Sequence, residues 1–313
     1  MSVQREKVRF ISGGAECAAW HYPGTNGACV VMAGGLAVPK EPATDRFAER
    51  FHAAGFSVLA FDYRRLGESG GRPRLVLSAR DQAADWRAAI GFARALPGVD
   101  PARIALWAFS ASAGHAVRVA AGDPRLAAVV AQTPYVGGVA PTRVVSRHQR
   151  PAAMLRFTAR GILDALGGLV GLRPRLVALA GPPGTVAMLT TPDALNGDRA
   201  LEADRYPDWP RKVAARSALG MVFYRPGRFM AQVRSPMLVL VCDDDQSTAA
   251  GPTIAAARRA PHAEVVRMPG GHYEPFLDGH KHAAAVELAF LRRHLLGRAP
   301  QRTRQEPAPA RRP

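Results

Sequence analysis

The first 135 residues alternate short apolar runs with helix-patterned segments, and this alternation limits the possible folds more than any other feature. Runs rich in β-branched residues and alanine occupy residues 28–33, 56–61, 103–108 and 126–131. Apolar residues at helical spacing lie between them, at residues 45–54, 78–96 and 112–121. Buried strands that alternate with helices form a mostly parallel sheet covered on both faces. The sequence therefore predicts an α/β protein.

The alternation stops near residue 135 and resumes with a predicted strand at 237–241. A helix at 253–259, a strand at 263–268 and a helix at 282–296 complete the predicted core. The segment between lacks the pattern and has two helical stretches, 152–172 and 204–222. We therefore predict a core of residues 1–134 and 234–297, a helical cap of 135–233 over the strand ends, and a disordered tail of 298–313 that is basic and proline-rich.

A serine stands where one predicted strand runs directly into a helix. Ser110 follows the strand 103–108 and has small residues two positions before and after it, Ala108 and Ser112. In a crowded strand-to-helix turn this arrangement exposes a nucleophilic hydroxyl above the sheet, although the usual Gly-x-Ser-x-Gly is replaced by Ala-x-Ser-x-Ser. Ser112 matches a second register, Ser-x-Ser-x-Gly114, and is the rival nucleophile. The strand length favours Ser110, and an ordinary serine-capped turn is the non-catalytic alternative.

A serine nucleophile needs a base and an orienting acid, and both follow in chain order after later strands. Residues 243–245 are three aspartates that follow the strand 237–241, and His272 follows two glycines after the strand 263–268. We predict Asp245 as the acid and His272 as the base. The alternatives are a solvated loop or a weak cation site for the aspartates, and a surface position for the histidine.

Backbone N–H groups can stabilise the oxyanion that forms in acyl transfer. Ala111 offers one at a helix N-terminus, directly after Ser110. The loop after the first predicted strand, Gly34-Gly35-Leu36, offers the second, most plausibly from Leu36. The two glycines could instead form a plain tight turn. A phosphate-binding role is disfavoured because the sequence has neither G-x-G-x-x-G nor a Walker lysine.

Over residues 20 to 296, the chain resembles the α/β-hydrolase superfamily. Residues 61–71, FDYRRLGESGG, look like its strand-four loop, and the segments 81–100 and 103–114 are similar to a bacterial branch near dienelactone hydrolases and cocaine esterases. The resemblance implies Ser110 as nucleophile, Asp245 as acid, His272 as base, a cap and no cofactor. The chain departs from the family at two places. Ala108 and Ser112 replace the two glycines around the nucleophilic serine, and Gly34-Gly35 stands where His-Gly is usual.

The insertion is apolar and aromatic in places. Its large apolar residues are Phe157, Leu163, Leu166, Leu169, Val170, Leu172, Trp209, Met221, Phe223 and Tyr224. We expect these side chains to form the core of the cap, and part of them to line a pocket for a medium-sized apolar substrate. A charge at Leu169 or Phe223 is then expected to weaken binding of long-chain esters.

The chain carries a formal charge of +17, from 42 basic and 25 acidic residues, and all but four of the basic residues are arginine. The arginines are spread over the whole chain, which favours a compositional origin over a nucleic-acid site. Three cysteines without CxxC spacing disfavour disulfides and a thiolate zinc site. With no signal peptide and no uninterrupted run of about 18 apolar residues, we expect a cytoplasmic protein without membrane or metal. Whether it acts alone or as a homodimer is open.

These features predict a serine hydrolase that cleaves an ester, thioester or lactone of an apolar small molecule through an acyl-enzyme. Two alternatives keep the fold. The same residues could catalyse elimination, cyclisation or acyl transfer in a biosynthetic pathway, or the chain could be a non-catalytic binding protein on this scaffold.

Overall fold

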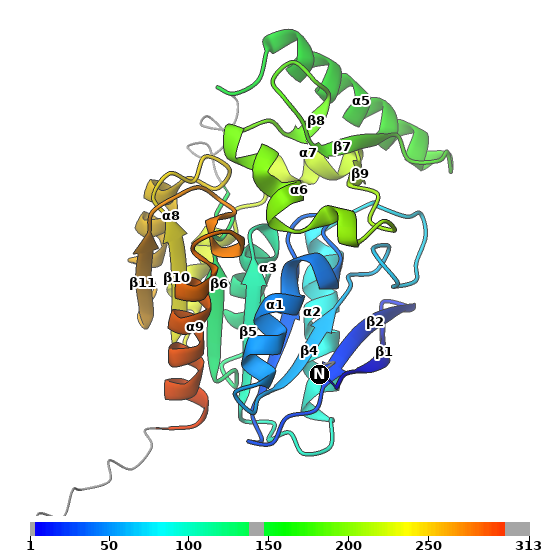
Figure 1. The fold of residues 1–313 in the computed structure, drawn as a ribbon. Helices are drawn as coiled ribbons and strands as arrows, with labels where there is room; N and C mark the ends of the chain where they lie inside the picture. The colour runs from blue at the N-terminus through cyan, green and yellow to red at the C-terminus, as the bar shows by residue number, and fades with distance from the viewer. Residues whose placement is uncertain (1–3, 138–146, 298–313) are drawn as a thin grey trace, which may run out of the picture.

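A computed structural model describes residues 4–137 and 147–297. Within these residues the core is an eight-stranded sheet in the order β1-β2-β4-β3-β5-β6-β10-β11 (Figure 1). Its strands are β1 Glu6–Ser12, β2 Ala15–Tyr22, β3 Cys29–Ala33, β4 Ser57–Phe61, β5 Ile104–Phe109, β6 Ala128–Gln132, β10 Met237–Cys242 and β11 Ala263–Met268. The six strands from β4 to β11 in this order (β4, β3, β5, β6, β10 and β11) pair in parallel, so the predicted α/β architecture is confirmed.

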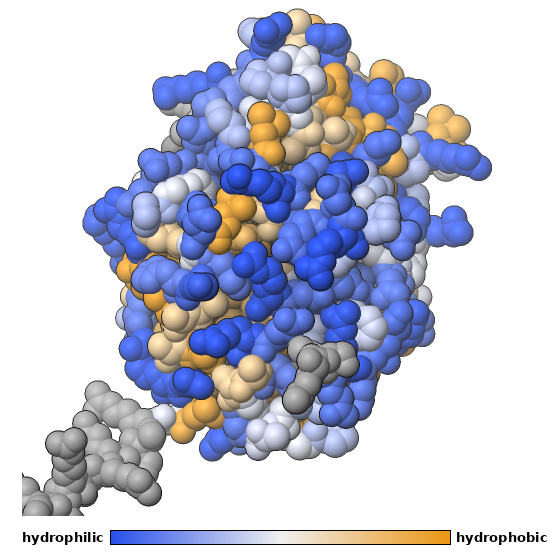
Figure 2. All heavy atoms as spheres, in the orientation of Figure 1, coloured by the Kyte–Doolittle hydropathy of each residue, from blue (hydrophilic) through white to orange (hydrophobic). Residues whose placement is uncertain are grey.

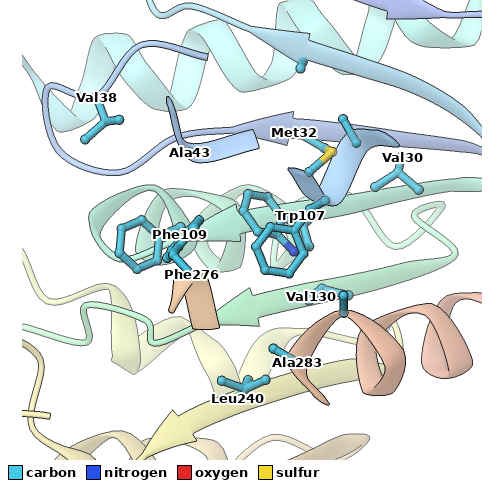
Figure 3. Packing of buried hydrophobic residues seen from close by; sticks show 14 of the residues in the cluster. Val30, Met32, Val38, Ala43, Trp107, Phe109, Val130, Leu240, Phe276 and Ala283 are labelled. Carbon is cyan, nitrogen blue, oxygen red and sulfur yellow. The ribbon is translucent and has the colours of Figure 1, made fainter. Parts of the chain in front are cut away.

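Helices cover both faces of the sheet (Figure 1). They are α1 Lys40–His52, α2 Ala79–Arg94, α3 Ala111–Ala120, α8 Ala250–Ala257 and α9 His280–Leu295. Two buried clusters follow from the alternation of side chains along each strand. The cluster under α1 and α9 includes Trp107, Phe109 and Phe276 (Figure 3). The other, under α2 and α3, includes Trp86, Leu106 and Phe61.

The antiparallel hairpin of β1 and β2 was not predicted from the sequence. Its strands pair from Glu6↔His21 to Ser12↔Ala15, and Gly13 and Gly14 form the turn, both with positive φ. Two strands separated by Gly-Gly are a hairpin signal. The signal is weak here because β2 reads AECAAWHY, with few of the residues that favour strands.

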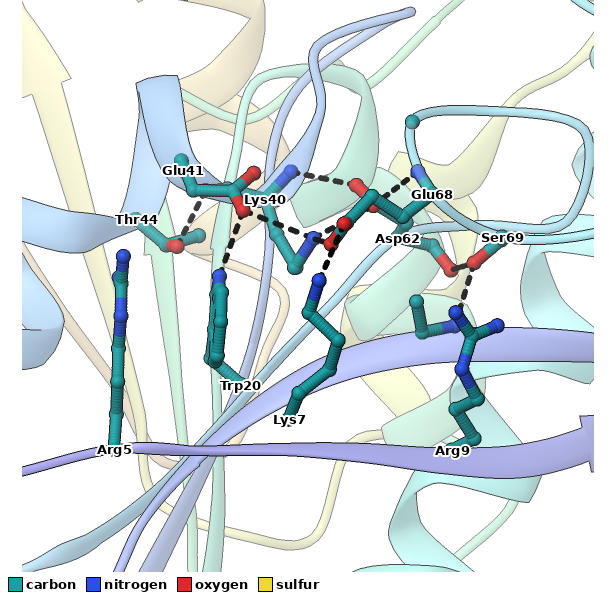
Figure 4. A network of polar contacts seen from close by, with 12 residues as sticks. Arg5, Lys7, Arg9, Trp20, Lys40, Glu41, Thr44, Asp62, Glu68 and Ser69 are labelled. Carbon is teal, nitrogen blue, oxygen red and sulfur yellow. Dashed lines mark hydrogen bonds and ion pairs between the residues drawn. The ribbon is translucent and has the colours of Figure 1, made fainter.

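Lys40 joins this hairpin to the loops of the core (Figure 4). Its side chain is fully buried, and Nζ lies 3.0 Å from both Asp62 Oδ2 and Glu41 Oε1 and 2.7 Å from Glu68 Oε2. Burial alone would lower the pKa of Lys40, but these carboxylates raise it above its ordinary value, so the ammonium stays charged. Trp20 of β2 donates from Nε1 to the same Glu41 oxygen at 2.7 Å. The network fixes the start of α1, directly after the loop 34–39.

The segment between β6 and β10 lies at the carboxyl ends of the core strands (Figure 1). Its described elements are α5 Pro151–Leu169, β7 Leu176–Ala180, β8 Ala187–Leu189, η1 Pro192–Asn196, α6 Gly197–Ala200, η2 Ala203–Arg205, β9 Lys212–Ala214, α7 Arg216–Phe223 and η3 Pro226–Gln232. One further short helix, η4 Glu274–Phe276, follows β11. Residues 138–146 of the predicted cap and the predicted tail 298–313 lie outside the described residues.

The cap segment contains a small sheet that the sequence analysis did not predict. Strands β8, β7 and β9 pair in that order, so the cap combines this sheet with its helices. The predicted helix 204–222 is wrong, because only its last part is α-helical, as α7. Pro207 and Pro210 remove backbone donors in its first half. Trp209, between them, is buried and donates from Nε1 to the carbonyl of Ala37 at 2.9 Å.

Candidate active site

Ser110 occupies the turn between β5 and α3 in a strained backbone conformation. Its φ is 58° and its ψ is −122°, a region that residues with a side chain rarely adopt. The backbone N–H of Ser110 donates to the Gln132 carbonyl at 3.0 Å, which holds the turn against β6. This geometry lifts the side chain out of the strand and directs it away from the sheet, as the sequence predicts for a strand-to-helix turn.

In the structure, hydrogen bonds link Ser110 to His272 and His272 to Asp245. We call these three residues the candidate row. His272 Nε2 lies 2.9 Å from Ser110 Oγ, and His272 Nδ1 lies 2.8 Å from Asp245 Oδ2. Asp245 and His272 are both buried. The residues come from the ends of β5, β10 and β11, which share one edge of the parallel sheet. The neighbouring Asp243 and Asp244 are exposed, and Asp243 pairs instead with Arg267 at 2.8 Å.

The acid and the base each shift the pKa of the other in the direction that favours its charged form. Burial disfavours the Asp245 carboxylate, but the charge and hydrogen bond of His272, with two further bonds from Thr248, bring its pKa below the ordinary value. Burial likewise disfavours the imidazolium, but Asp245 outweighs it and the pKa of His272 lies above its ordinary value of 6.5. An imidazole that gains a proton easily is suited to accept one from a serine hydroxyl.

The row opens into a cavity of about 320 Å³ between the core and the cap. Its walls are mostly apolar. Ser110, His272, Leu36 and Ala111 line it from the core, and Met154, Phe157, Ala187, Met188, Leu189, Ala218, Met221 and Val222 line it from the cap. The polar groups at its wall include Tyr135 and Gln149. A second cavity of about 610 Å³ lies beside Glu68 and Trp209, and neither Ser110 nor His272 lines it.

The loop that carries Leu36 packs directly on the serine turn. A Cβ added to Gly35 would lie 3.0 Å from Phe109 Cδ1 and 3.4 Å from Ser110 Cβ, so only glycine fits without displacement. Ala37, the residue after Leu36, has a φ of 53°, a second strained position beside the site. The Gly34-Gly35 sequence therefore brings this loop against the serine turn.

Comparison with known proteins identifies the family. The profile described as the alpha/beta hydrolase family matches residues 30–287. The chain belongs to this family.

Three relatives illustrate its range. The quorum-quenching protein AidA of Acinetobacter baumannii strain MDR-ZJ06 is 36% identical over 290 residues, which cover 91% of this chain and 94% of AidA. A thiohydrolase of Eupenicillium brefeldianum is 25% identical over 257 residues, 77% of this chain and 78% of its own. The crystal structure of the alpha/beta hydrolase GrgF from Penicillium sp. sh18 has a TM-score of 0.80 at 21% identity and covers 94% of this chain and 99% of GrgF. At that identity the likeness shows the fold alone.

The rival serine of this alpha/beta hydrolase lies in a different environment. Ser112 is buried and its hydroxyl is hydrogen-bonded to the Tyr63 hydroxyl, which accepts from Trp86 Nε1 at 2.7 Å. Ser112 does not line the cavity. The Ser112 hydroxyl therefore packs into the core of the protein through its polar contact with Tyr63.

The sequence analysis missed two residues that hold the row in place. Thr248 donates from its backbone to Asp245 Oδ1 at 2.6 Å and from Oγ1 to Oδ2 at 2.7 Å. The spacing of an aspartate and a threonine three residues apart, typical of a side-chain cap, could have indicated it. Asp193 of η1, in the cap, has no such local signal.

Asp193 contacts both loops that carry the acid and the base. Its Oδ2 accepts from the backbone of Gln246 at 2.7 Å, of Ser247 at 3.2 Å and of His272 at 3.3 Å. Its Oδ1 accepts from Ser247 Oγ at 2.8 Å. This one carboxylate therefore ties the cap to the ends of β10 and β11.

Proposed function

We propose that this alpha/beta hydrolase is a serine hydrolase that cleaves an ester, thioester or lactone of an apolar small molecule. The observation that carries the proposal is the hydrogen-bonded row of Ser110, His272 and Asp245 at the wall of an apolar cavity. A row of this kind supplies a nucleophile, its base and an orienting acid at hydrogen-bonding distances.

In the proposed mechanism, Ser110 Oγ attacks the carbonyl carbon while its proton passes to His272 Nε2. The backbone N–H groups of Ala111 and Leu36 stabilise the oxyanion. The bond to the alcohol or thiol then breaks, and that leaving group takes the proton from His272. Water attacks the acyl-enzyme, gives a proton to His272 and releases the acid, and Ser110 recovers its proton. Asp245 keeps the imidazole oriented and stabilises its charge.

The apolar cavity supports the proposal that the enzyme recognises its substrate by an acyl group of medium length. Most residues of its cap wall are apolar, among them three methionines, a leucine, a valine and a phenylalanine, which bind apolar surface without fixing a direction for hydrogen bonds. Two relatives are named a quorum-quenching protein and a thiohydrolase, and the second name supports the inclusion of thioesters among the substrates to be compared. The placement near dienelactone hydrolases and cocaine esterases stays a prediction.

The test compares two serine variants on a panel of p-nitrophenyl esters, thioesters and lactones. Ser110→Ala should lower kcat by about 10³-fold or more, because removal of the nucleophile leaves only binding and oxyanion contacts. Ser112→Ala should keep kcat within about tenfold, and labelling by a fluorophosphonate should require Ser110. Wild-type turnover in Ser110→Ala, with loss in Ser112→Ala, would refute the assignment. Formation of an alkene product that contains no ¹⁸O from labelled water would show elimination instead of hydrolysis. Transfer of the acyl group to an acceptor other than water would show acyl transfer.

The cavity is tested separately by its cap wall. Met188→Asp should raise KM more for long-chain than for acetate esters, since a charge at an apolar wall disfavours the chain and not the reacting carbonyl. The sequence analysis expected this effect for Leu169 and Phe223, but neither lines the cavity. Leu169→Asp therefore serves as the matched control, and equal changes in KM for both ester classes in Met188→Asp would contradict the assignment of the pocket.

A further inference from the structure

The outward face of α5 is apolar and exposed. Leu166 and Leu169 were expected in a buried core or a pocket, but they are 57% and 83% exposed, and Leu155 on the same helix is 72% exposed. Ile162, Leu163, Val170 and Leu172 are exposed as well, and so is Phe223 on α7, the helix that packs against α5. An exposed set of this size marks an interaction surface more often than chance.

Helical spacing gathers the leucines on one side of α5. Leu155, Ile162, Leu166 and Leu169 follow one another at seven, four and three residues, which places them along one stripe. The opposite side carries the three buried residues of the helix, Ala153, Gly161 and Asp164. We call the four outward residues the cap stripe. The helix therefore has one face that packs on the cap and a second apolar face without a partner among the described residues.

The charge around the cap stripe is positive. Residues 147–192 contain a single acidic residue, Asp164, and six arginines: Arg147, Arg150, Arg156, Arg160, Arg173 and Arg175. Asp164 is buried and accepts from Arg216 Nη2 at 2.9 Å, whereas all six arginines are exposed. Figure 2 shows hydrophobic residues among hydrophilic ones at the upper end of the molecule, where Figure 1 places α5.

The apolar stripe and the positive charge together distinguish between two binding partners, a second copy of the chain and a lipid surface. A second copy of the chain in a two-fold interface would bring the same arginines of both copies into one contact, where like charges repel. An anionic lipid surface is complementary to both features, because acyl chains accept the leucines and headgroups accept the arginines. We propose that the cap stripe and the exposed arginines of residues 147–175 bind an anionic lipid surface, with α5 lying in the headgroup region.

No helix of the described residues is long and apolar enough to cross a membrane. The expectation of no membrane partner rested on the missing spanning segment, and a helix that lies on the surface needs none. Helix α5 also reaches the candidate active site, since Met154, Phe157 and Thr158 line its cavity. Bound in this way, the cap would hold the cavity beside the lipid. The binding itself does not depend on the proposed hydrolysis.

Vesicle co-sedimentation tests the proposal with the full chain. We expect binding to vesicles of phosphatidylcholine and phosphatidylglycerol in equal parts, little binding to phosphatidylcholine alone, and weaker binding as salt is raised. The double variants Leu166→Asp/Leu169→Asp and Arg156→Glu/Arg160→Glu should each reduce binding by about tenfold or more. All four residues are exposed, so the variants should fold, and far-ultraviolet circular dichroism checks this.

Two control variants make the same chemical changes on the core. Ile11→Asp replaces an apolar residue of β1 that is 68% exposed, and Arg258→Glu reverses an exposed charge after α8. Both should bind vesicles as the wild type does. Absence of binding to anionic vesicles at low salt would overturn the proposal, as would equal losses in the controls. A dimer in light scattering that Leu166→Asp/Leu169→Asp converts to a monomer would also overturn it, because the face would then join two copies.

Discussion

Each residue of the candidate row stands where a strand of the parallel sheet ends. This is why Ser110, Asp245 and His272 could be predicted from local patterns: the carboxyl ends of neighbouring parallel strands meet at one edge of the sheet. The strand length favoured Ser110 over Ser112. What the sequence could not show is where the Ser112 hydroxyl goes, because its partner, Tyr63, lies in a distant loop.

The pH dependence of catalysis also depends on a single residue, His272. His272 must be neutral to accept a proton, and its pKa is raised above 6.5 by Asp245 against the opposing effect of burial. Activity should therefore fall as pH falls through that raised pKa, so the acidic limb of the kcat/KM profile should lie above pH 6.5. The profile on a p-nitrophenyl ester measures this limb directly.

Asp245→Asn gives the corresponding variant prediction. Loss of the carboxylate leaves burial dominant, so the pKa of His272 should drop and the acidic limb should move to lower pH. In addition, kcat should fall by about 10⁴-fold, because the amide no longer holds the required tautomer. Asp243→Asn, at an exposed aspartate two residues earlier, is the control and should leave both quantities unchanged. A limb that stays in place or moves upward in Asp245→Asn would contradict the coupling.

At the scale of elements, the parallel strands of the core were predictable, whereas the β1–β2 hairpin and much of the cap were not. The strand 263–268 was predicted with the bounds that β11 has, because its β-branched residues stand between turns, although β11 is an edge strand in which only Met268 is buried. The first half of the predicted helix 204–222 failed, because its prolines outweigh helical spacing. Helix α5 was predicted. Its sequence pattern could not show that one side packs on the rest of the cap while a second, apolar side is exposed.

Contacts between elements lie beyond local pattern, and Asp193 is the example with a functional consequence. Its carboxylate accepts four hydrogen bonds from the loops after β10 and β11. Asp193→Ala should lower kcat by about 10- to 10²-fold with little change in KM, because misplaced acid and base loops slow the reaction more than they weaken binding. Four donors without an acceptor should also cost about 1–3 kcal/mol in the free energy of unfolding.

Asp198→Ala is the matched control for this prediction. Asp198 lies five residues further along the same part of the cap, is exposed and pairs only with Arg211, at 3.2 Å, among the contacts of the described residues. Asp193→Asn, which keeps one oxygen as acceptor, should recover part of kcat. If Asp193→Ala and Asp198→Ala have the same kcat, the cap does not position the row.

At the scale of the whole molecule, Glu287 is a buried ionisable group that makes the stability of the sheet core depend on pH. Glu287 of α9 is fully buried, its Oε2 accepts from Trp107 Nε1 at 2.8 Å, and its Oε1 has no partner among the described residues. Burial raises the pKa of this carboxyl to about 8. The folded protein therefore keeps Glu287 neutral at pH 7, whereas the unfolded chain ionises it near its ordinary value of 4.5.

The sign of the pH effect follows from this difference. From pH 4.5 to about pH 8 the folded state holds one proton more than the unfolded state, so the contribution of Glu287 to stability falls as pH rises. The slope is at most about 1.4 kcal/mol per pH unit. Glu287→Gln still accepts from Trp107 and cannot ionise, so in urea unfolding it should match the wild type in acid and exceed it in mild alkali. Glu264→Gln, at an exposed glutamate of β11, should follow the wild type. Parallel pH profiles for wild type and Glu287→Gln would mean that the carboxyl ionises normally, and that its place beside Trp107 costs the fold nothing.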